Sequence, residues 1–194
     1  MENYIQTKIF ESQQVMQSML ADDNLQTNLI QSAKACIKSL TNGGKILLAG
    51  NGGSAADAQH IAGEFVSRFA FDRPGLSAIA LTTDTSILTA IGNDYGFEKL
   101  FARQIQALGQ AGDVFIGYST SGQSPNVLQG LIEARSRGLV CIGMTGNRGG
   151  SMHELCDYLL TVSNSDTPKI QEGHLVLGHI LCGLVESAMF KAQS

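Results

Sequence analysis

Two side chains that can move protons or bind a metal ion, His60 and Glu64, lie shortly after a glycine-rich segment, residues 50–54. The alanine-rich run around them predicts a helix, and residues four apart share one face of a helix. An imidazole beside a carboxylate can exchange protons with a substrate or bind a transition metal. The alternative is a histidine buried for structural reasons, which the neighbouring carboxylate and the glycine-rich segment disfavour. The pair therefore indicates an enzyme.

The glycine-rich segment, Gly50-Asn51-Gly52-Gly53-Ser54, follows the apolar run Ile46–Ala49, which predicts a buried strand. Its glycines thus lie at the turn between a strand and a helix, where they let backbone amides approach a ligand closely. The positive end of the following helix favours an anion. We expect a small anionic ligand at this turn.

A second polar segment, Ser119-Thr120-Ser121-Gly122-Gln123-Ser124, lies between the apolar run 114–118 and a helix expected to begin near Pro125. Its hydroxyls and the amides of the helix N-terminus can together bind a phosphate without a lysine. The alternative is an ordinary Ser/Thr-rich turn with a helix cap. Neither segment carries the Gly-Lys-Ser/Thr of a triphosphate-binding loop or the G-x-G-x-x-G of a dinucleotide site. Nucleotide hydrolysis and hydride transfer are therefore disfavoured.

The composition is that of one globular domain, residues 1–194, with 43% hydrophobic and 15% charged residues. A net charge of -4 and the lack of a Lys/Arg cluster argue against nucleic acid or a membrane surface as the main partner. The N-terminus has no apolar signal segment, so we expect a cytoplasmic protein. The cysteines are widely spaced in apolar surroundings, which predicts reduced core thiols; they are Cys36, Cys141, Cys156 and Cys182.

The pattern of apolar runs predicts an α/β fold, a three-layer sandwich with a five-stranded parallel sheet of the flavodoxin-like type. The expected strands are residues 46–49, 76–81, 114–118, 139–144 and 158–162, and a long closing helix is expected over 170–192. Two amphipathic helices, 2–21 and 24–42, precede the sheet. Periodicity leaves open whether this helical pair packs on its own sheet or on a partner subunit. Ligands of such sheets bind at the carboxyl ends of the strands.

Taken together and in order, these motifs resemble the sugar isomerase (SIS) domain over essentially the whole chain, and within it the phosphoheptose isomerase family. The motifs that carry the resemblance are residues 50–54, His60 with Glu64, Thr82–Thr85, Gly92–Phe97, Ser119–Ser124, and Ile170–Glu172 followed by His179. The resemblance implies conversion of D-sedoheptulose 7-phosphate to D-glycero-D-manno-heptose 7-phosphate, the first step toward the heptose of bacterial surface polysaccharide. It also implies a homotetramer with active sites shared between subunits.

The resemblance assigns roles to particular positions. The phosphate ligands would be Ser119, Thr120, Ser121 and Ser124, and the sugar contacts would be Asn51, Gly52, Gly53, Ser54, Glu64, Asn93, Asp94 and Gln171. The family binds zinc, one ion per subunit, for which the matching ligands are His60, Glu64, Gln171 and His179.

The reaction needs a base and an acid, because the carbonyl moves from C2 to C1 through an enediol. Glu64 is the natural base and His179 its partner. Zinc would act as a Lewis acid and needs an open coordination position. Glu64 cannot easily be a tight ligand and a free base in one step, so our hypothesis is that its two oxygens, or two successive states, divide these duties.

The spacing of Gln171 and His179 raises a geometric question. Eight residues on a regular helix correspond to about 12 Å of rise, which one metal ion could barely bridge. The metal lies midway at the limit of both side chains, or the helix begins irregularly near Gln171, or the two ligands come from different subunits. His174 is either a group supporting the site or a core histidine, and His153 is assigned no role.

Three glycines, Gly63, Gly173 and Gly178, fall inside the helices that carry the proposed ligands. Each costs roughly 1 kcal/mol of helix stability relative to alanine. We therefore expect a loosely held, cold-adapted site, and a higher melting temperature for Gly178→Ala. Tyr118 and Lys169 depart from the family pattern, in which we expect a small aliphatic residue and an arginine at these positions. The departures concern the details of substrate contact and not the catalytic residues.

Two other functions remain open. A non-catalytic adaptor with the SIS fold, of the type that associates with a replication initiator, would hold a partner protein instead of a substrate. Such adaptors tend to lose the acid-base and metal side chains, which this chain retains. An isomerase or sensor of another sugar phosphate would keep the serine segment without needing the metal ligands.

Overall fold

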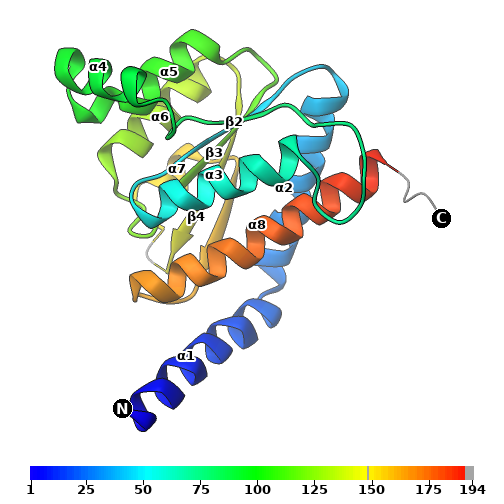
Figure 1. Ribbon diagram of the computed structural model, residues 1–194, viewed down its shortest axis with the longest axis vertical. Helices are drawn as coiled ribbons and strands as arrows, with labels where there is room; N and C mark the ends of the chain where they lie inside the picture. Colours follow the sequence, from blue (N-terminus) through cyan, green and yellow to red (C-terminus); the bar gives the residue numbers. More distant parts are fainter. Residues whose placement is uncertain (148, 191–194) are drawn as a thin grey trace.

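The structure, a computed structural model, describes residues 1–147 and 149–190 and contains one five-stranded sheet in which all strands are parallel (Figure 1). The strand order is β2-β1-β3-β4-β5. The strands are β1 (Ile46–Ala49), β2 (Ala78–Ala80), β3 (Val114–Ser119), β4 (Val140–Gly146) and β5 (Tyr158–Val162). The order reverses between β1 and β3, which in such sheets marks the place where ligands bind.

The helices alternate with the strands after an initial pair. They are α1 (Glu2–Leu20), α2 (Asp23–Thr41), α3 (Gly53–Val66), α4 (Thr85–Tyr95), a 3-10 turn η1 (Phe97–Lys99), α5 (Leu100–Leu108), α6 (Pro125–Ser136), α7 (Met152–Leu155) and α8 (Thr167–Met189). The expected strands and helices are all present, although α8 begins before residue 170. Its expected end at residue 192 lies outside the described residues.

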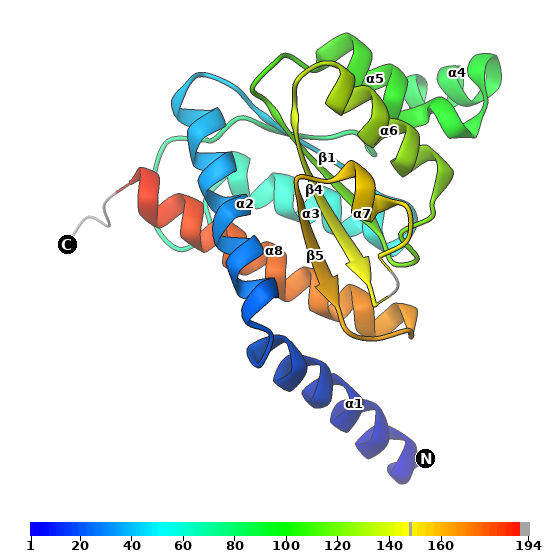
Figure 2. The same cartoon turned by 180° about the vertical axis from the view of Figure 1, so that it is seen from behind.

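The sheet is the middle of three layers. Because alternate residues of a strand point to opposite faces, Ile46 and Leu48 pack into one hydrophobic core and Leu47 and Ala49 into another. The first core is covered by α2, α3 and α8, and the second by α5 and α6 with contributions from α4 and α7 (Figures 1 and 2). The predicted three-layer α/β sandwich is therefore confirmed.

Local sequence determines where several helices begin. Asp22 caps α2 by accepting a hydrogen bond of 2.9 Å from the Leu25 amide, and Asp84 caps α4 in the same way through Ile87.

No described helix combines the length and apolarity needed to cross a bilayer.

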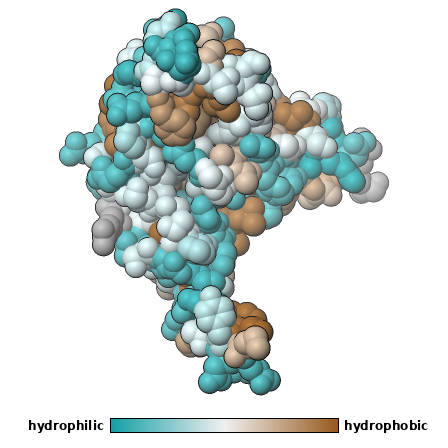
Figure 3. Space-filling view, turned by 60° about the vertical axis from the view of Figure 1, so that its left-hand side comes forward, coloured by the Kyte–Doolittle hydropathy of each residue, from teal (hydrophilic) through white to brown (hydrophobic). Residues whose placement is uncertain are grey.

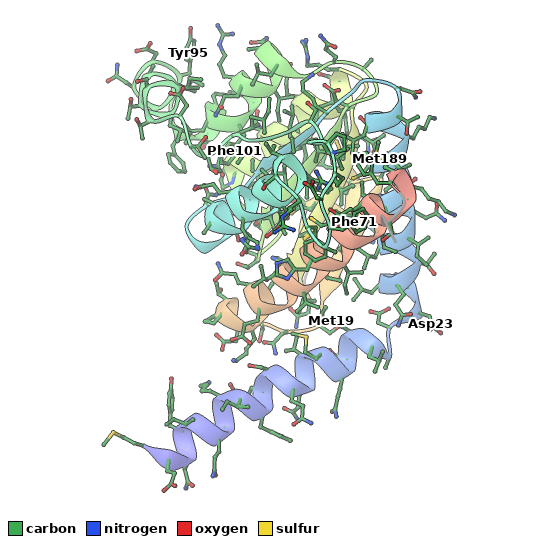
Figure 4. All side chains as sticks on the ribbon, turned by 45° about the vertical axis from the view of Figure 1, so that its right-hand side comes forward. Met19, Asp23, Phe71, Tyr95, Phe101 and Met189 are labelled. Carbon is green, nitrogen blue, oxygen red and sulfur yellow. The ribbon has the colours of Figure 1, made fainter. Side chains whose placement is uncertain are left out.

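The two N-terminal helices differ in how they pack. Helix α2 lies on its own sheet through Leu25, Leu29 and Ala33. Helix α1 projects away from the body and contacts it near its C-terminal end, where Met19 faces α8 (Figures 2 and 4). The Lys169 ammonium, which donates 2.6 Å to Ser12 Oγ, also connects α8 to α1. The helical pair is thus split: α2 packs on its own sheet, and most of α1 stands free of it.

Candidate active site

The glycine-rich and serine-rich loops meet at the carboxyl edge of the sheet, on the neighbouring strands β1 and β3. A reciprocal pair of side-chain amides connects them: Asn51 Nδ2 donates to Asn126 Oδ1 and Asn126 Nδ2 donates to Asn51 Oδ1, both at 2.8 Å. Asn126 lies in the first turn of α6 and is 1% exposed. The sequence analysis predicted Asn51 but missed Asn126, because an isolated asparagine after the serine loop carries no motif.

Close packing explains the glycines of the first loop. Gly52 has a φ of +56°, which favours glycine, and it caps the start of α3. A Cβ on Gly50 would lie 2.7 Å from the Ser54 carbonyl oxygen, and a Cβ on Gly53 would lie 2.6 Å from Gln171 Nε2. The loop therefore keeps its backbone open and in direct contact with the side chain of Gln171.

His60, Glu64 and His179 converge, as the sequence predicted, with one potential metal-binding atom of each lying within 4.8 Å of the others. The Nε2 atoms of His60 and His179 are 2.8 Å apart, and His60 Nε2 lies 3.4 Å from Glu64 Oε1. An imidazole nitrogen that carries no proton can bind a metal ion, so both Nε2 atoms are candidate metal ligands. The histidines are at least partly accessible and Glu64 is partly buried.

The eight-residue spacing of Gln171 and His179 has a simple origin. Helices α3 and α8 run side by side in the same direction (Figure 1), so Gln171 meets Gly53 at their beginnings and His179 meets His60 further along. Helix α8 is continuous through Gln171, so the expectation of an irregular start at that residue is wrong. Gln171 lies at the glycine loop, about two turns before the three converging side chains.

The serine loop forms its own hydrogen-bond network. Ser119 Oγ lies 2.8 Å from Ser124 Oγ and 3.4 Å from Ser121 Oγ, and it accepts from the Ser124 amide. Ser124 is the N-cap of α6, but its hydroxyl bonds to Ser119 instead of capping the helix. The loop is therefore ordered around its hydroxyls and not around a capping bond, which favours the ligand-binding interpretation over the plain turn.

A small cavity of about 180 Å³ opens beside this loop. Thr120 and Ser121 line one side of it. The other side is lined by Ile170, which belongs to a motif already noted in the sequence, and by three residues that the sequence analysis missed, Asn147, Ser165 and Thr167. These additional residues follow β4 and β5 or begin α8. They could have been found only from the rule that all carboxyl ends of parallel strands share one edge.

The backbone of the loop after β4 packs against the backbone of the serine loop. Gly122 and Gly150 both have positive φ, and a Cβ on either would lie within 3.0 Å of the other loop's backbone. The Gly146 amide donates 3.1 Å to the Thr120 carbonyl, and Ser151 Oγ donates 3.0 Å to Gln123 Oε1. Backbone-to-backbone packing thus fixes the position of the serine loop.

Asn93 and Asp94, predicted as sugar contacts, lie in the last turn of α4, where both are exposed. Asn93 Nδ2 donates 2.8 Å to Asp94 Oδ1. Their neighbour Tyr95 lies at the end of the molecule opposite α1 (Figure 4). Within the described residues of this chain, their hydrogen bonds do not join either loop, so their role stays a prediction.

Several further predictions concern residues near the site. His174 is buried and its Nε2 lies 3.1 Å from the Thr145 carbonyl oxygen, so it is a core histidine. Burial lowers the pKa of His174 to about 4.

Three other residues lie near the site. Tyr118 is buried, and the Lys169 ammonium donates hydrogen bonds to Ser12 and Glu172. Asp57, one turn before His60, was missed, and burial raises its pKa to about 6 despite the nearby His60.

The helical glycines were interpreted as sources of mobility, and two of the three have a packing role. A Cβ on Gly178 would lie 2.6 Å from Ile61 Cδ1, and a Cβ on Gly173 would lie 2.7 Å from Val162 Cγ2. Both glycines therefore allow α8 to pack closely against α3 and β5. A Cβ on Gly63 would meet nothing within 4 Å, so only this glycine is free of a packing role.

The fold and site define an α/β protein with glycine-rich and serine-rich loops at one edge of its parallel sheet and a neighbouring group of two histidines and a glutamate. The SIS domain family matches residues 10–146. A phosphoheptose isomerase from Burkholderia pseudomallei is 70% identical over 190 residues, which cover 98% of this chain and 96% of that protein. One from Aneurinibacillus thermoaerophilus is 58% identical over 98% of this chain and 96% of that protein.

Solved structures agree with the sequence relatives. The structure of phosphoheptose isomerase from Neisseria gonorrhoeae has a TM-score of 0.90 to this chain at 43% identity, covering 96% of this chain and 98% of that one. The corresponding structure from Francisella tularensis has a TM-score of 0.91 at 36% identity, covering 95% and 97%. The chain belongs to the SIS domain family and, within it, to the phosphoheptose isomerases.

Proposed function

We propose that the chain is an isomerase that converts D-sedoheptulose 7-phosphate to D-glycero-D-manno-heptose 7-phosphate, the first step of heptose synthesis for surface polysaccharide. The observation that carries this proposal is the convergence of His60, Glu64 and His179 within 4.8 Å, on helices adjoining a phosphate-suited loop. Relatives up to 70% identical are phosphoheptose isomerases, which supports the same substrate class.

The serine loop would hold the phosphate end of the substrate. Hydroxyls that now bond to one another, those of Ser119, Ser121 and Ser124, can rotate to donate to phosphate oxygens. The N-terminus of α6 adds amide donors and a favourable dipole at the same place. Thr120 lines the adjoining cavity and would complete the binding site.

The three converging side chains would act at the other end of the substrate. The Glu64 carboxylate takes the proton from C1 and returns it at C2, while the His179 ring gives a proton to the C2 oxygen and takes one from the C1 oxygen. No atoms are gained or lost, as an isomerisation requires. The backbone around Gly52 and Gly53, with Asn51 and Ser54, would position the sugar chain between the two ends.

The donor set suits zinc, because two imidazole nitrogens and one carboxylate oxygen are typical of catalytic zinc sites with an open position. When bound, zinc would polarise the carbonyl oxygen of the substrate. We propose Gln171 as a sugar contact, since its amide lies against the backbone of Gly53, whereas its predicted role as a fourth metal ligand would require its side chain to reach about two turns along α8. The division of Glu64 between ligation and proton transfer stays our hypothesis.

We also propose that the chain assembles as a homotetramer. Helix α1 projects from the body and exposes the apolar side chains Tyr4, Ile5, Ile9 and Phe10, and hydrophobic atoms gather on this projecting end (Figure 3). A groove of about 530 Å³ between α1, α2 and α8 is lined almost entirely by apolar residues, including Met16, Leu29 and Ile180. Such surfaces are typical of protein–protein contacts. Subunits associating through them could bring Asn93 and Asp94 to a neighbouring site.

We place the reaction in the cytoplasm, because a charged sugar phosphate does not cross a bilayer unaided. The partners of the chain on this proposal are its substrate and further copies of itself, and neither nucleic acid nor a membrane is required.

The test is turnover of D-sedoheptulose 7-phosphate by purified protein, before and after chelation and after zinc is restored. Loss on chelation and recovery with zinc are the expected results. No turnover by folded, zinc-loaded protein would contradict the proposal. In that case binding of a protein partner would favour the adaptor, and turnover of an amino-sugar phosphate would favour another isomerase.

A further inference from the structure

A buried ion pair connects the far end of α3 to α8. Arg73 lies in the segment after α3 and Glu186 lies two turns beyond His179 on α8. Arg73 Nε is 3.0 Å from Glu186 Oε1, and the two side chains are 2% and 1% exposed. A buried pair of this kind is weak support for stability alone, because removing both charges from water costs much of what their attraction returns.

The arginine binds the main chain of the helix that carries Glu64. Its guanidinium donates 2.8 Å to the Glu64 carbonyl, 2.7 Å to the Phe65 carbonyl and 3.1 Å to the Ser67 carbonyl. These are carbonyls of the last turn of α3 and its cap, which lack partners inside the helix. Arg73 therefore fixes the end of α3 at the residue that carries the proposed base.

The glutamate holds the segment that follows α3. Glu186 accepts 2.9 Å from the Phe69 amide and 2.7 Å from the Ala70 amide. This segment, which also carries Phe71, passes over α8 (Figure 4). Glu186 thereby sets the position of the Phe69 side chain.

The Phe69 ring packs against His179. Their ring centroids are 5.6 Å apart and the rings are tilted by 39°. A Cβ on Gly183, one turn beyond His179, would lie 3.4 Å from Phe69 Cε1. The lack of a side chain at Gly183 therefore leaves room for the Phe69 ring. Through the ring on one side and the Glu64 main chain on the other, the ion pair reaches two of the three converging side chains without touching them.

We propose that Arg73 and Glu186 are positioning residues that fix the separation of α3 and α8, and so set the spacing of His60, Glu64 and His179 for a divalent metal ion. This rests on the proposed function, because it assumes that the three side chains bind a metal. The role differs from the hydrogen bonds that usually orient metal ligands, since both charged groups act on backbone and on a packed ring.

The experiment compares Glu186→Gln with Asp113→Asn. Asp113 is an equally buried carboxylate that binds Lys45 Nζ at 2.7 Å and two backbone amides, but it lies at the amino ends of the strands, away from the site. Zinc affinity of the metal-free proteins is measured by competition with a chromophoric chelator, with melting temperature, kcat and KM alongside. Both variants should melt at lower temperature.

The expected result is a loss of about 10-fold or more in zinc affinity for Glu186→Gln, the size seen when supports of metal ligands are removed. Its kcat at saturating zinc should fall, with KM changed less than 3-fold, and Asp113→Asn should keep zinc affinity and kcat. Zinc affinity of Glu186→Gln within 3-fold of wild type would overturn the inference and leave a structural ion pair.

Phe69→Leu keeps the inference testable if Glu186→Gln does not fold. It removes the ring from His179 without changing a charge, and we expect at least a 3-fold loss of zinc affinity. Unchanged affinity would count against positioning through the ring. A wild-type protein that binds no zinc would instead contradict the proposed metal site itself, so the two failures are distinguishable.

Discussion

Asn51 and Asn126 pair their side-chain amides reciprocally, with two hydrogen bonds of 2.8 Å across the point where the strand order reverses. The pair fixes the glycine loop relative to the helix that begins at the serine loop. Asn126 is therefore the residue that joins the two halves of the active site.

Replacing Asn126 with aspartate should weaken the pair of hydrogen bonds between Asn51 and residue 126. The change removes the donor to Asn51 Oδ1 and sets two oxygens against each other, at a cost of about 1–3 kcal/mol in a buried position. We expect kcat/KM to fall by at least 10-fold, measured by steady-state kinetics. Asn28→Ala, which removes a single amide bond to the Leu159 carbonyl, is the control and should leave kcat/KM unchanged. Unaltered kinetics in both variants would contradict the role given to Asn126.

Glu64→Gln should abolish most of the turnover while leaving the phosphate end of the site intact. Removing a general base typically costs about 10²–10⁴-fold in rate. We expect kcat to fall within that range and inorganic phosphate to bind as in the wild type, because among the described residues the hydroxyls of the serine loop form their hydrogen bonds within the loop and not with Glu64. Equal losses of phosphate binding and turnover would point to misfolding.

The helical glycines should respond oppositely to alanine. Gly63→Ala adds a methyl group in open space and should stabilise the chain by about 0.5–1 kcal/mol, raising the melting temperature by roughly 1–4 °C. Gly178→Ala places a methyl group 2.6 Å from Ile61 Cδ1 and should cost about 1–3 kcal/mol. Calorimetry of the two variants checks both signs. A higher melting temperature for Gly178→Ala would restore the mobility interpretation.

Stability should depend on pH through His174, whose pKa of about 4 lies below the ordinary histidine value of 6.5 because the side chain is buried. Between these values the unfolded chain binds the proton more readily, so the free energy of unfolding falls as pH drops, by up to about 1.4 kcal/mol per unit. Asp57 acts in the opposite sense, because its pKa is raised to about 6 and the folded chain takes the proton first.

The comparison of wild type with His174→Gln isolates this contribution, since Asp57 is common to both. Denaturant unfolding at pH 7 and pH 5 should show a larger loss for the wild type, and the variant should lack the difference. If the free energies of unfolding of the two proteins differ by the same amount at pH 7 and pH 5, protonation of His174 does not destabilise the folded protein.

The parts of this structure that the sequence predicted are those governed by local patterns. Apolar runs located all five strands, and residues four apart on α3 gave His60 and Glu64 correctly. The packing role of the glycines in α8 was not predicted, because Gly178 acts through Ile61, more than a hundred residues away in the chain. Arg73 and Glu186 were missed for the same reason, since an isolated charge carries no sign of a distant partner.

The parallel course of α3 and α8 has a further meaning for selectivity. One end of a substrate would bind at the serine loop and the other at His179, and the Asn51–Asn126 pair keeps the serine loop at a constant distance from the glycine loop where α3 begins. The distance between these two binding places would therefore select substrates by their length. A ketose phosphate of the right carbon count would reach Glu64 with its C1, and a shorter one would bind through its phosphate yet leave its carbonyl out of range.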